Sequence, residues 1–203
     1  MVDGALWPGH SRGVTANTGP ATSSSTSSAK IVLVPLLVGC AVSLSLGVYA
    51  AAHEPTGEAI TTLGFSGMIN MKVWLTTGAA TLAIVQLVTA LRMFGHLGSG
   101  QAPQWVAVLH RSSGTVAVLL TAPVAFHCLW ALGFSTFDAR TVTHSLLGCA
   151  FYGAFVAKLL SLKMRRVPAW SLPLFGALTF VVLVGLWLGS SLWFFRTVGF
   201  PEF

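Results

Sequence analysis

Histidines are the residues of this sequence whose type and spacing best suit chemistry. Six are present, and five of them border or interrupt long apolar runs: His53, His96, His110, His127 and His144. A neutral imidazole offers one nitrogen lone pair to a metal or a proton, and its other nitrogen donates a hydrogen bond. Inside an apolar segment such a side chain is costly, so each of these histidines needs either a partner or a function.

Five apolar segments carry or flank these histidines. The chain of 203 residues is 54% hydrophobic and only 8% charged, whereas soluble domains have about 25% charged residues. Each segment is close to the roughly 20 residues that span the hydrocarbon core of a bilayer, and they cover about 31–52, 71–95, 104–132, 142–164 and 169–195. The sequence therefore predicts an all-α integral membrane protein, a five-helix transmembrane bundle over residues 31–203 of a multi-pass protein in the cell membrane.

Residues 1–30 differ in composition from the rest of the chain. The segment is rich in serine and threonine, has almost no apolar periodicity and contains His10. We expect it to be a disordered cytoplasmic tail, because it cannot bury enough surface to offset the entropy of ordering. An alternative is that the first apolar run is a signal peptide, since Ala50–Ala52 resembles a cleavage site.

Basic residues predict the orientation of the bundle. A cytoplasmic N-terminus places most lysines and arginines inside, and leaves Lys72, Arg140 and Arg196 outside. Tryptophans then lie at both interfaces, and the C-terminus is outside. The basic residues are scattered over helix ends and form no stripe, so we expect the lipid bilayer as the main partner and no nucleic acid.

Depth in the membrane sorts the histidines into two groups. His53, His127 and His144 share the outer level, while His96 and His110 share the inner level. Two imidazoles at one depth on different helices are what a six-coordinate haem needs, with an apolar lining around the porphyrin. Aromatic side chains available for this lining are Phe126, Trp130, Phe134, Phe151 and Tyr152. The alternative is that histidines at helix ends contact water, headgroups or backbone.

The sequence resembles two groups of known proteins, and one of them bears on a cofactor. Leu109-His110-Arg111-Ser112-Ser113-Gly114, on a helix that ends in His127, resembles the LHRxxG…H pattern of membrane b-type cytochromes and ferric-reductase-like transmembrane domains. The chain from about 45 to 196 also resembles a family of actinobacterial membrane proteins with no established activity. The residues that carry this second resemblance are Leu109–Arg111, Pro123–Trp130 and His144–Cys149. The first resemblance implies haem b and electron transfer.

The spacing departs from the pattern of two-haem bundles. His110 and His127 are 17 residues apart, which is about 26 Å along a helix but turns the second side chain about 100° away from the first. A single outer haem is therefore favoured, held by His127 with either His144 or His53, and an inner haem on His110 and His96 is an extension. Arg111 or Arg140 would pair with the haem propionates.

Other features bear on packing and partners. Pro123 should kink the third helix and aim His127 inward, and Gln86 should bond to a neighbouring helix. Glycines that should mark close helix contacts are Gly148, Gly153, Gly185 and Gly189. The three cysteines, Cys40, Cys128 and Cys149, are expected to be small buried hydrophobes, without a disulfide or zinc site.

No complete catalytic motif or dinucleotide fingerprint is present, so a redox role needs an outside partner protein or a quinone. The alternative function is a non-catalytic membrane subunit or scaffold without cofactor.

Overall fold

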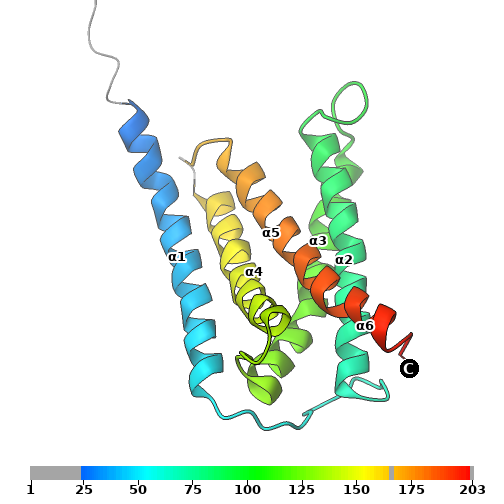
Figure 1. Cartoon of the computed structure of the whole chain (residues 1–203). Coiled ribbons are helices and arrows are strands. Elements are labelled where there is room, and N and C mark those ends of the chain that lie inside the picture. The colour runs from blue at the N-terminus through cyan, green and yellow to red at the C-terminus, as the bar shows by residue number, and fades with distance from the viewer. Residues whose placement is uncertain (1–23, 165–166, 202–203) are drawn as a thin grey trace, which may run out of the picture.

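The computed structural model describes residues 24–164 and 167–201, and these form a bundle of long helices without strands. The elements are α1 (Ser24–Ala52), α2 (Met68–Met93), α3 (Gln104–His127), η1 (Cys128–Leu132), α4 (Ala139–Lys163), α5 (Ser171–Trp187), η2 (Leu188–Leu192) and α6 (Trp193–Thr197). The symbol η marks a π-helical turn. Because η1 continues α3, and η2 and α6 continue α5, the chain makes five rods (Figure 1).

All five rods are long and apolar enough to cross a membrane. Each spanning segment is helical because a helix satisfies every backbone donor and acceptor internally where lipid offers no partner. Many large apolar side chains lie on the outside of the bundle, such as Leu44, which is 69% exposed. The predicted all-helical fold, with five helices long and apolar enough to span a membrane, is therefore confirmed for the described residues, whereas the orientation of the helices stays a prediction.

The predicted boundaries shift at several helix ends. α1 begins at Ser24, inside the segment predicted as a disordered tail, and the remainder of that tail, with His10, lies outside the described residues. α2 and α4 both begin earlier than predicted, at Met68 and Ala139. At α4 the reason is local: Asp138 caps the helix through a capping box with Thr141, whose backbone N–H donates to the carboxylate at 2.7 Å.

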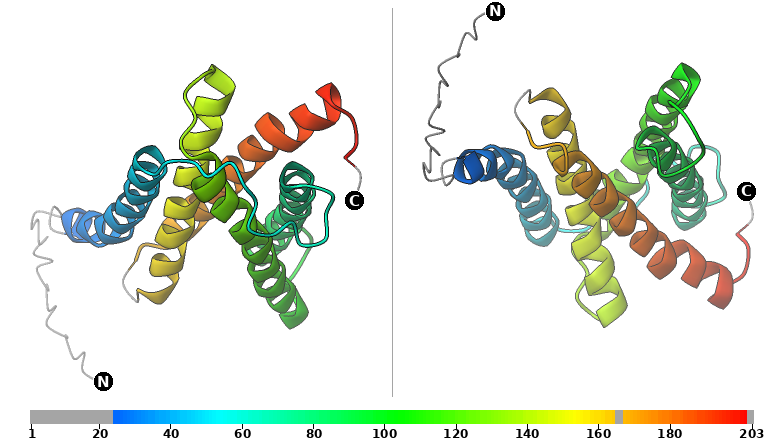
Figure 2. Two further views of the ribbon diagram at one scale, coloured as in Figure 1. Left: turned by 90° about the horizontal axis from the view of Figure 1, so that it is seen from below. Right: turned by 90° about the horizontal axis from the view of Figure 1, so that it is seen from above.

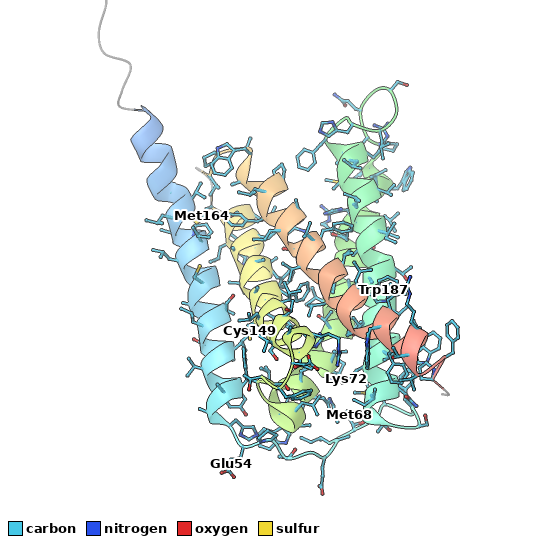
Figure 3. The ribbon with its side chains drawn as sticks, viewed as in Figure 1. Glu54, Met68, Lys72, Cys149, Met164 and Trp187 are labelled. Atoms are coloured by element: carbon cyan, nitrogen blue, oxygen red, sulfur yellow. The ribbon has the colours of Figure 1, made fainter. Side chains whose placement is uncertain are left out.

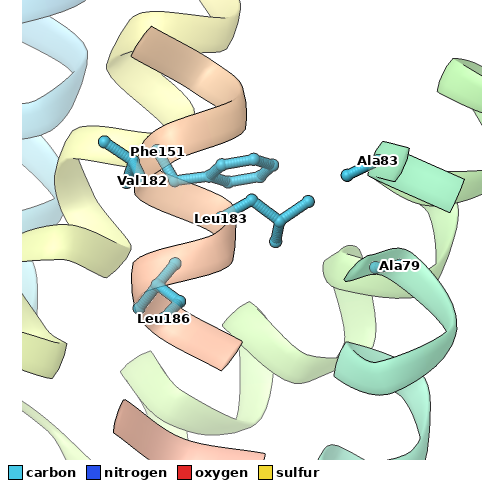
Figure 4. Packing of buried hydrophobic residues seen from close by; sticks show 6 residues of the cluster. All are labelled: Ala79, Ala83, Phe151, Val182, Leu183 and Leu186. Carbon is cyan, nitrogen blue, oxygen red and sulfur yellow. The ribbon is translucent and has the colours of Figure 1, made fainter. Parts of the chain in front are cut away.

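The helices pack as a pair and a trio. α2 packs along α3, while α4 packs between α1 and α5, and α2 also contacts α5 (Figure 2). The main apolar core lies where α2, α4 and α5 meet (Figure 4), and its buried members are Ala79, Ala83, Phe151, Val182, Leu183 and Leu186. α3 and α4 make few backbone contacts with each other.

Small residues allow close approach at only some of the predicted positions. A Cβ at Gly153 would meet the backbone carbonyl of Gly39 in α1 and the hydroxyl of Ser43, so this glycine is required for the α1–α4 contact. Gly185 lies against Leu147 of α4. The prediction is wrong for Gly148 and Gly189, because nothing lies within 4 Å of a Cβ at either position. The spacing of glycines does not say which face of the helix is covered.

Candidate functional site

A cavity of about 460 Å³ lies near the end of the bundle where α1 ends and α2 and α4 begin. We call this the lower end, as drawn in Figure 1, and the opposite end the upper end. All five rods contribute to the wall, which is mainly apolar. Aromatic side chains on it are Phe134, Phe137, Phe151, Tyr152, Trp193 and Phe194. Pockets of 300–1,000 Å³ with apolar walls and a few converging polar groups are typical ligand sites.

Both π-helical turns border this cavity. Cys128, Leu129 and Leu132 of η1 are on the wall, as are Ser190 and Ser191 of η2. A π-turn widens the backbone ring and leaves groups without their usual helical partner, and such turns are frequent at functional sites. Two of them facing one cavity indicate that the helices are locally adapted to form it.

The segment after α1 secures the end of η1. Backbone N–H groups of Thr56 and Gly57 donate to the carbonyls of Trp130 and Ala131, at 3.3 and 3.0 Å. These carbonyls lie at a helix end and have no partner within the helix. Gly133, with φ of 64°, then turns the chain in a left-handed conformation, and a Cβ there would meet Pro55. The lower end therefore has a defined shape.

His127 is the most buried of the predicted ligands, at 1% exposure. Its Nδ1 lies 2.7 Å from the carbonyl oxygen of Pro123, one turn earlier. A carbonyl only accepts, so Nδ1 carries the proton, and the lone pair is left on Nε2. That Nε2 is buried and has no hydrogen-bond partner among the described residues. This is the arrangement of a metal-binding imidazole, in which a backbone carbonyl fixes the tautomer and the other nitrogen is free.

His144, in the second turn of α4, lies on the cavity wall, and its Nδ1 is buried without a partner. Its imidazole is close to the thiol of Cys128, and Lys72 of α2 approaches the same sulfur. These three side chains come from three different helical rods. The prediction that the cysteines are buried hydrophobes is wrong for Cys40, which is exposed, and it misses the place of Cys128 on the wall.

His53 has a different environment. Its ring stacks between Tyr49 and Trp130, with ring centroids 5.3 and 4.6 Å away. Its Nε2 lies 3.2 Å from the Trp130 carbonyl, which only accepts, so Nε2 donates. His53 therefore attaches the end of α1 to η1, and it is not among the residues that line the cavity. Of the two alternatives for the partner of His127, only His144 lies on the cavity wall.

The other two histidines lie at the upper end. His96 is exposed in the loop after α2. The Nδ1 of His110 makes a 2.8 Å hydrogen bond with the hydroxyl of Thr89 in α2. The side-chain amide of Gln86 donates to the His110 carbonyl and to the Ser113 hydroxyl, which confirms the predicted interhelical bond. These contacts hold α2 and α3 together.

Charges on the cavity wall are all positive. Lys72 and Arg140 are its only charged members among the described residues. The Arg140 guanidinium lies 3.9 Å from the centroid of the Trp193 ring, and its Nη1 is 3.5 Å from the carbonyl of Gly189. Asp138 is nearby but fully exposed, and its pKa is lowered mainly by the backbone hydrogen bond from Thr141 and further by the Arg140 charge.

The predicted lining is present in part. Phe134, Phe151 and Tyr152 are on the wall, and the Tyr152 hydroxyl donates to the Thr121 carbonyl at 3.0 Å. Phe126 is 45% exposed, and Trp130 stacks on His53, so neither lines the cavity.

Three residues that the sequence did not predict for the site also line the cavity: Lys72, Cys128 and Cys149 (Figure 3 labels Lys72 and Cys149). The available signal was Lys72 itself, a charge placed inside the first turns of an apolar helix.

Metal-ligating side chains do not cluster in larger groups. Within the described residues, no set of three or more His, Cys, Asp or Glu side chains is arranged to hold a metal ion. A bare ion usually needs three or four protein ligands. Haem iron needs at most two, because the porphyrin supplies the other four nitrogens. The two unpartnered imidazoles therefore suit a haem better than a bare metal ion.

Comparison with known proteins identifies a family but no activity. Residues 32–202 match the model of a family described as "Family of unknown function (DUF6529)". Neither the curated proteins nor the solved structures give a match. The resemblance to b-type cytochromes stays a prediction.

Proposed function

The chain belongs to this family of unknown function, and we propose that it is a multi-pass membrane electron carrier of the b-type cytochrome class with one haem b at the lower end. The observation that carries this proposal is that His127 and His144 each keep a buried ring nitrogen without a hydrogen-bond partner. An unpartnered buried polar group costs about 1–3 kcal/mol, so a ligand that engages it supplies a physical reason for its presence.

The cavity also meets the other requirements of a haem. A porphyrin needs apolar and aromatic walls, and the wall has both. Its propionates need cations, and Arg140 and Lys72 are on the wall. Its iron needs an imidazole, which His144 supplies from the wall. Arg140 was one of the two arginines predicted for this role, whereas Arg111 is exposed at the upper end.

His127 is the proposed second ligand, and it poses a specific requirement. It directly precedes Cys128, which is on the wall, but its own ring is not among the wall residues. Ligation from both sides therefore requires the His127 ring to become part of the cavity. The fixed Nδ1 proton on the Pro123 carbonyl already leaves Nε2 as the ligating atom.

The protein residues orient and enclose the group, and haem iron, when bound, supplies one-electron redox chemistry. The apolar and aromatic wall would enclose the porphyrin, and the imidazoles of His144 and His127 would hold the iron. A carrier of this kind exchanges electrons with an outside partner protein or a quinone. In the orientation predicted from the basic residues, the lower end faces the outside of the cell.

The test is the optical spectrum of the full chain, expressed with haem available and purified, before and after reduction with dithionite. We expect a Soret band and reduced α and β bands, with loss of at least tenfold in bound haem in His144→Ala and His127→Ala. His96→Ala is the matched control and should retain full haem content, because its side chain is exposed. Colourless protein with normal helical content would refute the proposal.

A second candidate function, a membrane subunit or scaffold without cofactor, is favoured by the contacts of His53 and His110. Both rings are used to join helices, through Trp130 and Thr89 respectively. The same spectra decide between the two functions: colourless protein whose His127→Ala variant changes only in stability supports the scaffold.

A further inference from the structure

We propose that Lys72 and Arg140 form an anion clamp, through which the lower-end cavity selects amphipathic ligands with an apolar body and carboxylate groups. The inference deepens the proposed function and rests on the same cavity. The clamp would recognise the carboxylate end of a ligand, independently of any bond to iron.

The charge on the cavity wall is positive and unbalanced. Lys72 lies in the first turns of the apolar helix α2, and Arg140 lies in the first turn of α4. Both line the cavity, and no aspartate or glutamate among the described residues does so. Two cations that face a largely apolar space have poor solvation there, and a counter-anion would offset that cost.

The existing contacts of Arg140 bring no negative charge to its guanidinium. The Trp193 ring and the Gly189 carbonyl position the guanidinium, and both are neutral. The nearby carboxylate of Asp138 accepts the Thr141 N–H and is exposed to solvent, where its attraction is screened. The Arg140 fork is thereby held in place with donors left for a carboxylate, which it can bind in bidentate fashion.

The two cations reach the cavity from different helices. Lys72 of α2 approaches the Cys128 sulfur, whereas Arg140 lies at the start of α4. A ligand in the cavity therefore meets one cation from α2 and one from α4. The apolar remainder of the wall accommodates the body of such a ligand. The two sources of this chemistry are the propionates of a porphyrin and the carboxylate of a fatty acid.

The experiment uses the purified full chain in detergent, free of haem, and follows quenching of tryptophan fluorescence. The probes are protoporphyrin IX, which has two carboxylates and no iron, and its dimethyl ester. We expect the diacid to bind at least tenfold more tightly than the ester. Lys72→Met and Arg140→Met should each weaken diacid binding about tenfold and leave ester binding unchanged, and Lys72→Arg should restore most of the loss. Arg111→Met, an exposed cation at the upper end, is the control.

Equal affinity for the diacid and the ester would overturn the clamp, as would unchanged diacid binding in both methionine variants with wild-type helical content. Displacement of the diacid by oleate in the wild type, but not by oleyl alcohol, would also support the clamp and identify a fatty-acid carboxylate as a ligand. Failure of the proposed function is distinguishable: if iron is not ligated, haem binds no more tightly than protoporphyrin IX, while the preference for the diacid over the ester persists.

Discussion

The five helical rods meet in two different ways. Along α2–α3 and α1–α4 the contacts are close, and polar groups such as Gln86, Thr89 and His110 have partners across the interface. At the lower end, by contrast, two histidines keep a buried ring nitrogen without a hydrogen-bond partner: His144, which lies on the cavity wall, and His127, which directly precedes the wall residue Cys128. The same residue type thus serves packing at one interface and is left available at the other. The hydrogen-bond state of a buried histidine, more than its depth, separates the two roles.

The largest effect should come from adding one methyl group at a close interface. Gly153→Ala places a Cβ against the Gly39 carbonyl and the Ser43 hydroxyl, and overpacking of this kind costs about 1–3 kcal/mol. Gly148→Ala is the matched control on the same helix, at a position with nothing within 4 Å, and should change stability little. Reversible unfolding in detergent measures both. Equal losses in the two variants would contradict the distinction between close and open interfaces.

A smaller loss should follow from removing the amide that joins α2 to α3. Gln86→Leu deletes the donor to the His110 carbonyl and the Ser113 hydroxyl, and interhelical hydrogen bonds in membranes are worth about 0.6–1.7 kcal/mol. The same unfolding measurement should show a loss in this range. Thr81→Val, which removes an exposed hydroxyl bonded only to its own helix, should have less effect. The haem content of Gln86→Leu should equal that of the wild type, because this network is remote from the cavity.

The smallest predicted effect concerns pH and the start of α4. The pKa of Asp138 is lowered in the folded protein, so its ionised form stabilises the fold. That contribution is fully present above the unfolded pKa of about 3.9 and is lost as the pH falls through the lower folded value. Between about pH 5 and pH 3 the wild type should therefore lose slightly more thermal stability than Asp138→Asn. An identical acid profile in the two proteins would show that the charge of the Asp138 carboxylate contributes nothing to stability.

The helices were predictable from sequence, whereas the site was predictable only in part. A run of about 20 apolar residues satisfies its backbone hydrogen bonds in lipid by forming a helix, and so hydropathy predicts five helices. Position along the chain also placed His53, His127 and His144 at one end of the bundle. Which of them are unpartnered was not predictable, because the bond from His53 to the Trp130 carbonyl depends on the π-turn of η1. π-turns leave no periodic signature in apolar sequence.

Helix faces were also not predictable. The bundle is apolar all round, so periodicity does not show which side of a helix faces a neighbour. The glycine spacing therefore predicts a contact at Gly189, although this residue has open space around it. The basic residues predict only a level for Lys72, and its place on the cavity wall does not follow from the sequence. Both cases concern the azimuth of a side chain around its helix, which only packing determines.

In the proposed electron carrier, the two unpartnered imidazoles at the lower end bind one haem between them. The most direct measurement is the haem content per chain of the purified protein, determined as the pyridine haemochrome, together with the spin state of the oxidised iron by electron paramagnetic resonance. We predict one haem b per chain with a low-spin signal typical of two imidazole ligands, converted to high spin in His144→Ala or His127→Ala. Two haems per chain, a high-spin wild type, or no haem in well-folded protein would contradict it.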